Sequence, residues 1–101
     1  MTPYHLVEER GVNSLWVGND VPADALTLHI SEVQPGKRAH PPHTHDGVEC
    51  FFMLEGRAAM EIGGERIELD ASDGIVLEPS TLHGLVNFGD VPMRYMVIIA
   101  K

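Results

Sequence analysis

The chain has 101 residues, 44% of them hydrophobic, which is enough for one domain with one core over residues 1–101 and too few for two. Fifteen acidic against seven basic residues give a net charge of −8, which disfavours nucleic acid or an anionic membrane as partner and favours a small-molecule ligand. A single cysteine rules out an intrachain disulfide, and neither a secretory leader nor an apolar run of membrane-spanning length is present, so we expect a cytoplasmic protein.

Short β-prone runs separated by glycine and proline turns follow one another along almost the whole chain. Gly63-Gly64 is a two-residue hairpin signal, and Pro35-Gly36 and Gly89-Asp90 mark further turns. The expected strands are residues 4–8, 14–17, 26–33, 50–54, 57–62, 65–69, 74–77, 82–88 and 93–100. Many short strands at even spacing predict an all-β sandwich or barrel.

The run H-T-H-D-G-V-E-C-F-F-M-L-E-G, residues 43–56, is the densest group of metal-ligating residue types. Alternation in an extended chain puts His43 and His45 on one face, and Glu49 stays on that face if Asp46-Gly47 causes no slip of register. Two imidazoles and a carboxylate from one strand are three ligands that a divalent first-row metal accepts. The alternative for the same residues is a solvated loop of polar side chains.

A second motif, in which three residues separate His83 from Asn87, opens another β-prone run. Together the two segments resemble the cupin superfamily, whose motifs have the form G-x5-H-x-H-x3,4-E-x6-G and G-x5-P-x-G-x2-H-x3-N. The sequence departs from these motifs in three ways. Six residues separate Gly36 from His43, and serines at positions 72 and 80 replace glycines. The two serines leave the conformation of the turns around them undecided. The resemblance implies a single jelly-roll β-barrel and four metal ligands, His43, His45, Glu49 and His83.

Alternation from these ligands predicts what fills the barrel. Phe51 and Met53 point inward with Glu49, and Leu85 and Asn87 point inward with His83; Ala58, Met60 and Ile62 are also expected inside, with Arg57, Ala59 and Glu61 outside. The lumen is therefore apolar apart from the ligands and holds no lysine or arginine, which argues against a phosphosugar substrate. Cys50, adjacent to Glu49, faces away from the metal.

Two further histidines are candidate catalytic residues. His29 belongs to a polar strand face, Thr27-x-His29-x-Ser31, that alternates with an apolar one. It therefore either faces solvent or lines the cavity. His40 precedes Pro41-Pro42, which hold the chain extended, and is a rim histidine, a fifth ligand or an acid/base.

The predicted ligand set leaves a divalent ion (Fe, Mn, Ni or Zn) with open positions for substrate or dioxygen. We expect a metal-dependent enzyme on a small organic molecule, with dioxygenase chemistry slightly favoured over isomerase, epimerase or lyase chemistry. The alternative is a non-catalytic ligand-binding module. A homodimer is also expected, because Tyr4, Leu6 and Val7 and the apolar residues 96–100 offer surfaces on which a partner could pair or pack.

Overall fold

The computed structural model describes residues 4–9, 12–17, 25–43, 47–78 and 80–100, with the backbone alone for 4–9, 12–17 and 40–43. These residues form ten strands in two antiparallel sheets and no helix, so none of them could cross a bilayer as a helix. The strands are β1 (Tyr4–Glu9), β2 (Val12–Val17), β3 (Leu26–Val33), β4 (Arg38–His43), β5 (Val48–Glu55), β6 (Arg57–Ile62), β7 (Glu65–Asp70), β8 (Gly74–Leu77), β9 (His83–Val86) and β10 (Met93–Ala100).

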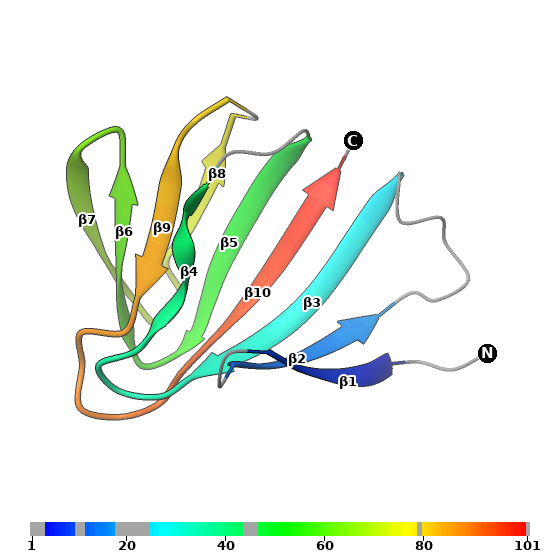
Figure 1. Ribbon diagram of the computed structural model, residues 1–101, viewed down its shortest axis with the longest axis horizontal. Coiled ribbons are helices and arrows are strands. Elements are labelled where there is room, and N and C mark those ends of the chain that lie inside the picture. Colours follow the sequence, from blue (N-terminus) through cyan, green and yellow to red (C-terminus); the bar gives the residue numbers. More distant parts are fainter. Residues whose placement is uncertain (1–3, 10–11, 18–24, 44–46, 79, 101) are drawn as a thin grey trace.

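The large sheet has the order β1-β2-β3-β10-β5-β8, and the small sheet has the order β4-β9-β6-β7. Figure 1 shows β10 lying between β3 and β5, so the strand nearest the C-terminal end of the sequence is central in the large sheet. This two-sheet antiparallel architecture is the jelly-roll barrel that the sequence predicts.

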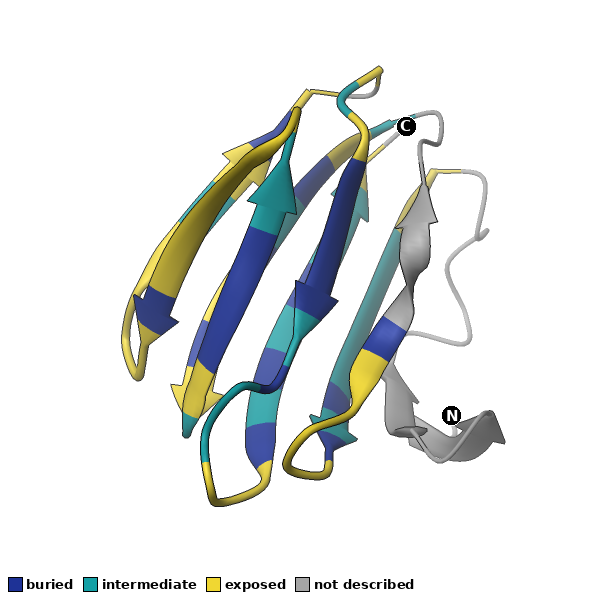
Figure 2. Cartoon of the chain, turned by 60° about the vertical axis from the view of Figure 1, so that its left-hand side comes forward, coloured by how far each residue is buried: buried dark blue, intermediate teal, exposed yellow. Residues whose placement is uncertain are grey.

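The core fills the space between the two sheets (Figure 2). Side chains that alternate along each strand meet there, as a pleated strand with one buried face requires. The predicted inward positions of β5, β6 and β9 are confirmed: Phe51, Met53, Ala58, Met60 and Leu85 are buried and Ile62 packs against them. Ala59, expected outside, is fully buried but lies outside the main cluster, which is completed by Val33, Ala39, Leu69, Leu77, Met93, Tyr95 and Val97.

Two turn positions explain how the strands are joined. Gly63 and Gly64 have φ of 54° and 87°, the pair of positive values that a tight two-residue hairpin turn needs between β6 and β7. At Gly56 a Cβ atom would lie 2.8 Å from the Pro92 carbonyl oxygen, so no other residue fits where β5 passes into β6.

The sequence left undecided which conformation the chain takes at Ser72 and Ser80, the two serines that replace glycines of the second motif. Ser72 keeps the left-handed conformation that a glycine would adopt, with φ of 76°, and its N–H donates to the Met53 carbonyl at 2.8 Å. Ser80, which is also described, does not have a positive φ. The turn before β8 is therefore retained although a serine occupies it.

Asn87, buried just after β9, ties two loops to the barrel. Its side-chain NH₂ donates to the carbonyls of Val33 at 3.0 Å and Val91 at 2.8 Å, and its amide oxygen accepts from the Gly89 N–H at 2.9 Å. Its backbone N–H donates to Lys37 and its carbonyl accepts from Gly36, both at 2.9 Å. This residue of the second motif therefore holds structure, because every polar group of its side chain is engaged with backbone.

Candidate metal centre

Glu49 and His83 lie against each other although they come from opposite sheets. Glu49 is near the start of β5 in the large sheet, and His83 begins β9 in the small sheet. Glu49 Oε1 is 2.7 Å from His83 Nε2, and the two side chains are 5% and 1% exposed. The structure thus brings two of the four predicted ligands together inside the barrel.

The ring orientation of His83 is set by a backbone contact. His83 Nδ1 is 2.9 Å from the Thr81 carbonyl oxygen, which can only accept, so Nδ1 carries the proton. In the neutral ring Nε2 then presents its lone pair toward the carboxylate. Two acceptors at this separation require a positive ion, either a proton or a metal cation, to hold them together.

The spacing of the pair agrees with shared coordination of one ion. Two ligand atoms at about 2.1 Å from a metal and at roughly 90° are about 3 Å apart. The observed 2.7 Å between Glu49 Oε1 and His83 Nε2 is close to that value. A carbonyl that fixes the second ring nitrogen is also the usual support of a ligating histidine.

The remaining two predicted ligands fall wholly or partly outside the described residues. The backbone of His43 is paired with that of His83 in the β4–β9 ladder, but its side chain is not described, and His45 lies outside the described residues altogether. Within the described side chains, no group of three or more His, Cys, Asp or Glu is assembled as a metal site. The four-ligand set therefore stays a prediction.

One step of the motif interpretation is wrong. His43 and Glu49 were expected on one strand, but His43 ends β4 in the small sheet and Glu49 belongs to β5 in the large sheet. Gly47, with φ of 92°, stands just before β5 where the chain has changed sheets. Alternation along a single strand consequently does not account for any convergence of these residues.

The surroundings of the pair are apolar, as expected. Phe51 stands between His83 and Tyr95, with ring centroids 5.9 Å and 5.8 Å away. Among the described residues, the buried polar or charged side chains are Ser31, Glu49, His83 and Asn87, and no lysine or arginine is buried.

A chain of polar contacts lies on the inner face of the large sheet. His29 Nδ1 is 2.9 Å from Ser31 Oγ, and Tyr95 is hydrogen-bonded to the same serine, which is opposite it in the β3–β10 register. Burial raises the pKa of Tyr95 to about 12; the hydrogen bond to Ser31 opposes the shift and the charge of Glu49 adds to it. His29 is half-buried and contacts a buried serine.

Ser31 and Tyr95 were not singled out from the sequence. The polar alternation of residues 27–31 pointed to this face, but the contact depends on Tyr95 standing opposite Ser31. Local patterns do not provide the register of strands so distant in the chain. His40, the other candidate, is paired through its backbone with Leu85, and its side chain is not described.

Comparison with known families settles the relationship. The model of the family described as "Cupin domain" matches residues 29–99, well over half of the chain. The chain belongs to the cupin family. Cupins often bind a metal ion, and this cupin carries the Glu49–His83 pair within the matched segment.

Solved cupins share the fold across a wide range of described roles. A predicted oxalate decarboxylase from Thermotoga maritima has a TM-score of 0.82 and 18% identity, covering 96% of this chain and 90% of that one. A sugar phosphate isomerase from Silicibacter pomeroyi has a TM-score of 0.79 and 19% identity, covering 90% and 60%. The cupin domain of a transcriptional regulator from Enterobacter cloacae has a TM-score of 0.78 and 18% identity, covering 89% and 96%.

A curated relative gives a closer but shorter match. An uncharacterised protein of Methanocaldococcus jannaschii is 35% identical over 48 residues, which are 48% of this chain and 38% of that protein. The chain thus spans well under two thirds of the relative's length. These comparisons establish family and fold for this cupin.

Proposed function

We propose that this cupin binds one divalent transition-metal ion through His43, His45, Glu49 and His83 and acts with it on a small organic molecule. The observation that carries the proposal is the buried contact between Glu49 Oε1 and His83 Nε2, which are 2.7 Å apart. The ion is Fe, Mn, Ni or Zn, since imidazole and carboxylate ligands suit each of them. Once bound, such an ion supplies Lewis-acid chemistry or, if it is redox-active, activation of dioxygen.

The residues around the pair have separate roles in this proposal. The Thr81 carbonyl holds the His83 ring in the tautomer that presents Nε2 to the site. Phe51 and Leu85, both buried, exclude water from the interior and strengthen electrostatic interactions there. A substrate is held by these apolar walls rather than by charged groups.

His29 is our candidate for proton transfer to or from the ligand. Its Nδ1 contacts Ser31, which also bonds Tyr95, so the ring is oriented by groups that are themselves fixed. We assign the proton exchange to Nε2, the other ring nitrogen. His40 remains the second candidate, on the strength of the sequence alone.

Oxygenase chemistry is slightly favoured, with isomerase, epimerase or lyase chemistry and non-catalytic ligand binding as the alternatives. The lack of buried lysine or arginine among the described residues disfavours a phosphorylated substrate. The net charge of −8 disfavours nucleic acid and anionic membranes as partners. The cytoplasm is the proposed location, since a single cysteine makes no demand for an oxidising compartment.

Metal content of purified variants tests the ligand set. Wild-type protein is expected to hold about one equivalent by inductively coupled plasma mass spectrometry, and Glu49→Gln, His83→Ala and His45→Ala are each expected to hold less than about a tenth. Glu49→Gln keeps the shape of the side chain and so separates lost ligation from lost folding. His29→Gln, placed on the polar chain, is the matched control and retains the metal.

The reaction class is tested separately on metal-loaded protein. Oxygen consumption is measured with the iron form across diketones, phenols and thiol acids, and the products are analysed by mass spectrometry. Conversion without oxygen uptake favours the isomerase or lyase alternative, and binding without conversion favours the ligand-binding module. A Glu49→Gln variant that holds one equivalent with unchanged affinity would overturn the proposed centre.

A further inference from the structure

A row of polar side chains follows β3 on the inner face of the large sheet. Thr27, His29 and Ser31 alternate along this strand with apolar residues that face the other way. Across the sheet from His29 the row gives way to apolar side chains, Val97 on β10 and then Phe51 on β5. A ligand in the barrel interior therefore has a polar edge beside β3. This inference rests on the proposed function, because it takes the barrel interior as the ligand site.

The hydrogen bonds of this row have a direction, which Tyr95 sets. The Tyr95 hydroxyl is buried and bonded to Ser31, and a neutral phenol has one proton to donate, so Ser31 Oγ accepts it. The Ser31 hydroxyl has a proton of its own, and His29 Nδ1 lies 2.9 Å from Ser31 Oγ. Donation of that proton to His29 continues the chain of hydrogen bonds and makes Nδ1 an acceptor.

A neutral imidazole that accepts at Nδ1 carries its proton at Nε2. We propose that His29 Nε2–H donates a hydrogen bond to an oxygen of the bound ligand. The barrel then selects small molecules that carry a carbonyl or carboxylate oxygen remote from their metal-binding group. Ser31 and Tyr95 are positioning residues in this arrangement, because they act on the ligand only through the His29 ring.

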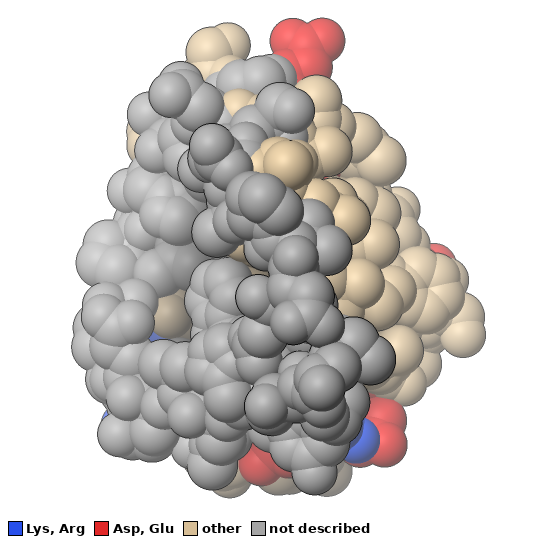
Figure 3. All heavy atoms as spheres, turned by 90° about the vertical axis from the view of Figure 1, so that its right-hand side faces the viewer, with Lys and Arg blue, Asp and Glu red and all other residues tan. Residues whose placement is uncertain are grey.

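A neutral donor suits the charge distribution around this oxygen. Among the described residues, no lysine or arginine is buried. Figure 3, which shows the side of the molecule where β3 lies, has its described charged atoms mainly at the upper and lower ends of the view. An acceptor oxygen in the interior loses affinity unless a donor replaces water, and His29 Nε2–H supplies one. A ligand group that can only donate, such as an ammonium, would meet the Nε2 proton and be rejected.

The strand register sets the form of the ligand. Glu49 on β5 stands opposite Ile99 of β10, and His29 on β3 stands opposite Val97 of β10. The two polar groups are therefore two strand spacings apart across the sheet, about 10 Å at the backbone. Val97 is buried and Ile99 packs against the core, so the surface between them is apolar. A ligand that reaches both ends has an apolar segment of a few carbon atoms between its oxygen-bearing groups.

Nitrogen-15 NMR of the histidine rings in the full chain tests the direction of the hydrogen bonds. The neutral His29 ring, assigned by the signals that are lost in His29→Gln, is expected to be protonated at Nε2 and unprotonated at Nδ1. Tyr95→Phe removes the first donor and is expected to raise the population of the Nδ1–H form about fivefold, the factor that corresponds to one net hydrogen bond. Thr27→Val removes the other hydroxyl of the row and is the matched control, with an unchanged tautomer.

Three hydroxamic acids with the same metal-binding head test the ligand class on zinc-loaded protein. They are pentanohydroxamic acid, its 4-oxo derivative, which adds a ketone oxygen, and succinic monohydroxamic acid, which ends in a carboxylate. Calorimetric titration is expected to give both oxygen-bearing probes a dissociation constant at least about tenfold below that of the first. His29→Leu is expected to remove this advantage and to keep the metal. The difference between the two oxygen-bearing probes shows whether a neutral or a charged acceptor is preferred.

Three results would overturn the inference. They are a wild-type His29 ring protonated at Nδ1, a tautomer that does not respond to Tyr95→Phe, and wild-type protein that fails to bind the oxygen-bearing probes more tightly. Circular dichroism verifies that each variant folds, and the wild-type tautomer needs no variant. The tautomer is measured without metal and the metal content without a ligand, so failure of this inference and failure of the proposed centre are distinguishable.

Discussion

Ionisation of Tyr95 makes the stability of the fold depend on pH in the alkaline range. Its hydroxyl is buried and bonded to Ser31, and its pKa is raised to about 12, chiefly by burial. The unfolded value is about 10, so the protonated phenol stabilises the fold fully below pH 10, and this contribution is lost as pH rises toward 12. The free energy of unfolding of the wild type should therefore decline over that interval.

Tyr95→Phe isolates this effect. At pH 8 we expect the variant to be less stable by about 1 kcal/mol, for the lost hydrogen bond to Ser31. The deficit should shrink as pH rises from 10 to 11.5, because phenylalanine has no proton to lose. Urea unfolding at three pH values measures this, and a deficit that is constant with pH would contradict the assignment.

The Glu49–His83 pair shows how far single residues can be predicted. The spacing of the motifs identified Glu49 and His83, and the structure places them in contact. The Thr81 carbonyl that fixes the His83 tautomer was not predictable, since any backbone carbonyl can serve and composition does not mark it. Ser31 and Tyr95 needed the register of β3 against β10, which is a tertiary property.

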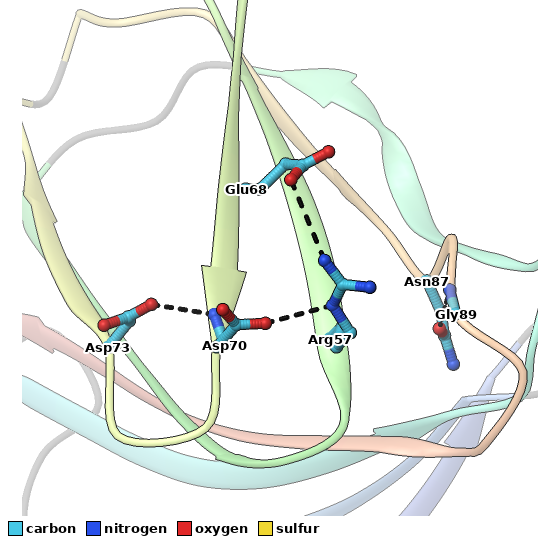
Figure 4. A network of polar contacts seen from close by, with 6 residues as sticks. All are labelled: Arg57, Glu68, Asp70, Asp73, Asn87 and Gly89. Carbon is cyan, nitrogen blue, oxygen red and sulfur yellow. Dashed lines mark hydrogen bonds and ion pairs between the residues drawn. The ribbon is translucent and has the colours of Figure 1, made fainter.

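The β6–β7 hairpin is the element whose structure is most directly predicted by its sequence. Its strands pair from Arg57 opposite Asp70 to Ile62 opposite Glu65, with Gly63-Gly64 as the turn. Arg57 lies 3.0 Å from Asp70 and 3.8 Å from Glu68 (Figure 4), and its guanidinium is 5.0 Å from the Phe88 ring. These contacts are exposed and contribute little, so the hairpin depends on its turn and on the burial of Ala58, Met60 and Leu69 in the core.

Substitutions at Gly63 should show how much the turn contributes to the free energy of unfolding. A Cβ there meets nothing within 4 Å, so only backbone strain acts at its φ of 54°. We expect Gly63→Asn to be nearly neutral, since asparagine tolerates the left-handed region, and Gly63→Val to destabilise by about 1–2 kcal/mol. Thermal unfolding of both variants measures the difference; equal stabilities would mean that the turn relaxes.

Nine of the ten strands were predicted to within two residues at each end, and one was missed. The runs 26–33, 57–62, 74–77 and 93–100 coincide with observed strands. β4 (Arg38–His43) was missed as a strand because Pro41-Pro42 interrupts the pattern. Proline is tolerated there because β4 is an edge strand of the small sheet and its register against β9 shifts between His40 and His43, so the ladder is already irregular at Pro41-Pro42.

At the scale of the whole molecule, a metal that bridges the two sheets should stabilise the fold. Glu49 belongs to the large sheet and His83 to the small sheet, so an ion held by both links them. Binding to the native state alone is worth about 4 kcal/mol at a thousandfold excess over Kd, which for a chain of about 100 residues corresponds to roughly 15 °C or more in Tm.

Removal of the metal by a chelator is therefore expected to lower the Tm of wild-type protein by about that amount. Differential scanning calorimetry with and without chelator measures it. Glu49→Gln provides the control, because its Tm should not respond to the chelator. A wild-type Tm that is indifferent to chelator would mean that no metal links the sheets.

The central place of β10 also bears on how the chain acquires its structure during synthesis. β3 and β5 both pair with β10 and not with each other, and β10 follows them by some forty residues or more. While the ribosome is still making residues 93–100, the β1–β3 meander and β5 have no common neighbour, and their unpaired edges stay open to other chains and to chaperones. The large sheet consequently closes late, by long-range pairing, and folding of the nascent chain should be abrupt once β10 leaves the exit tunnel.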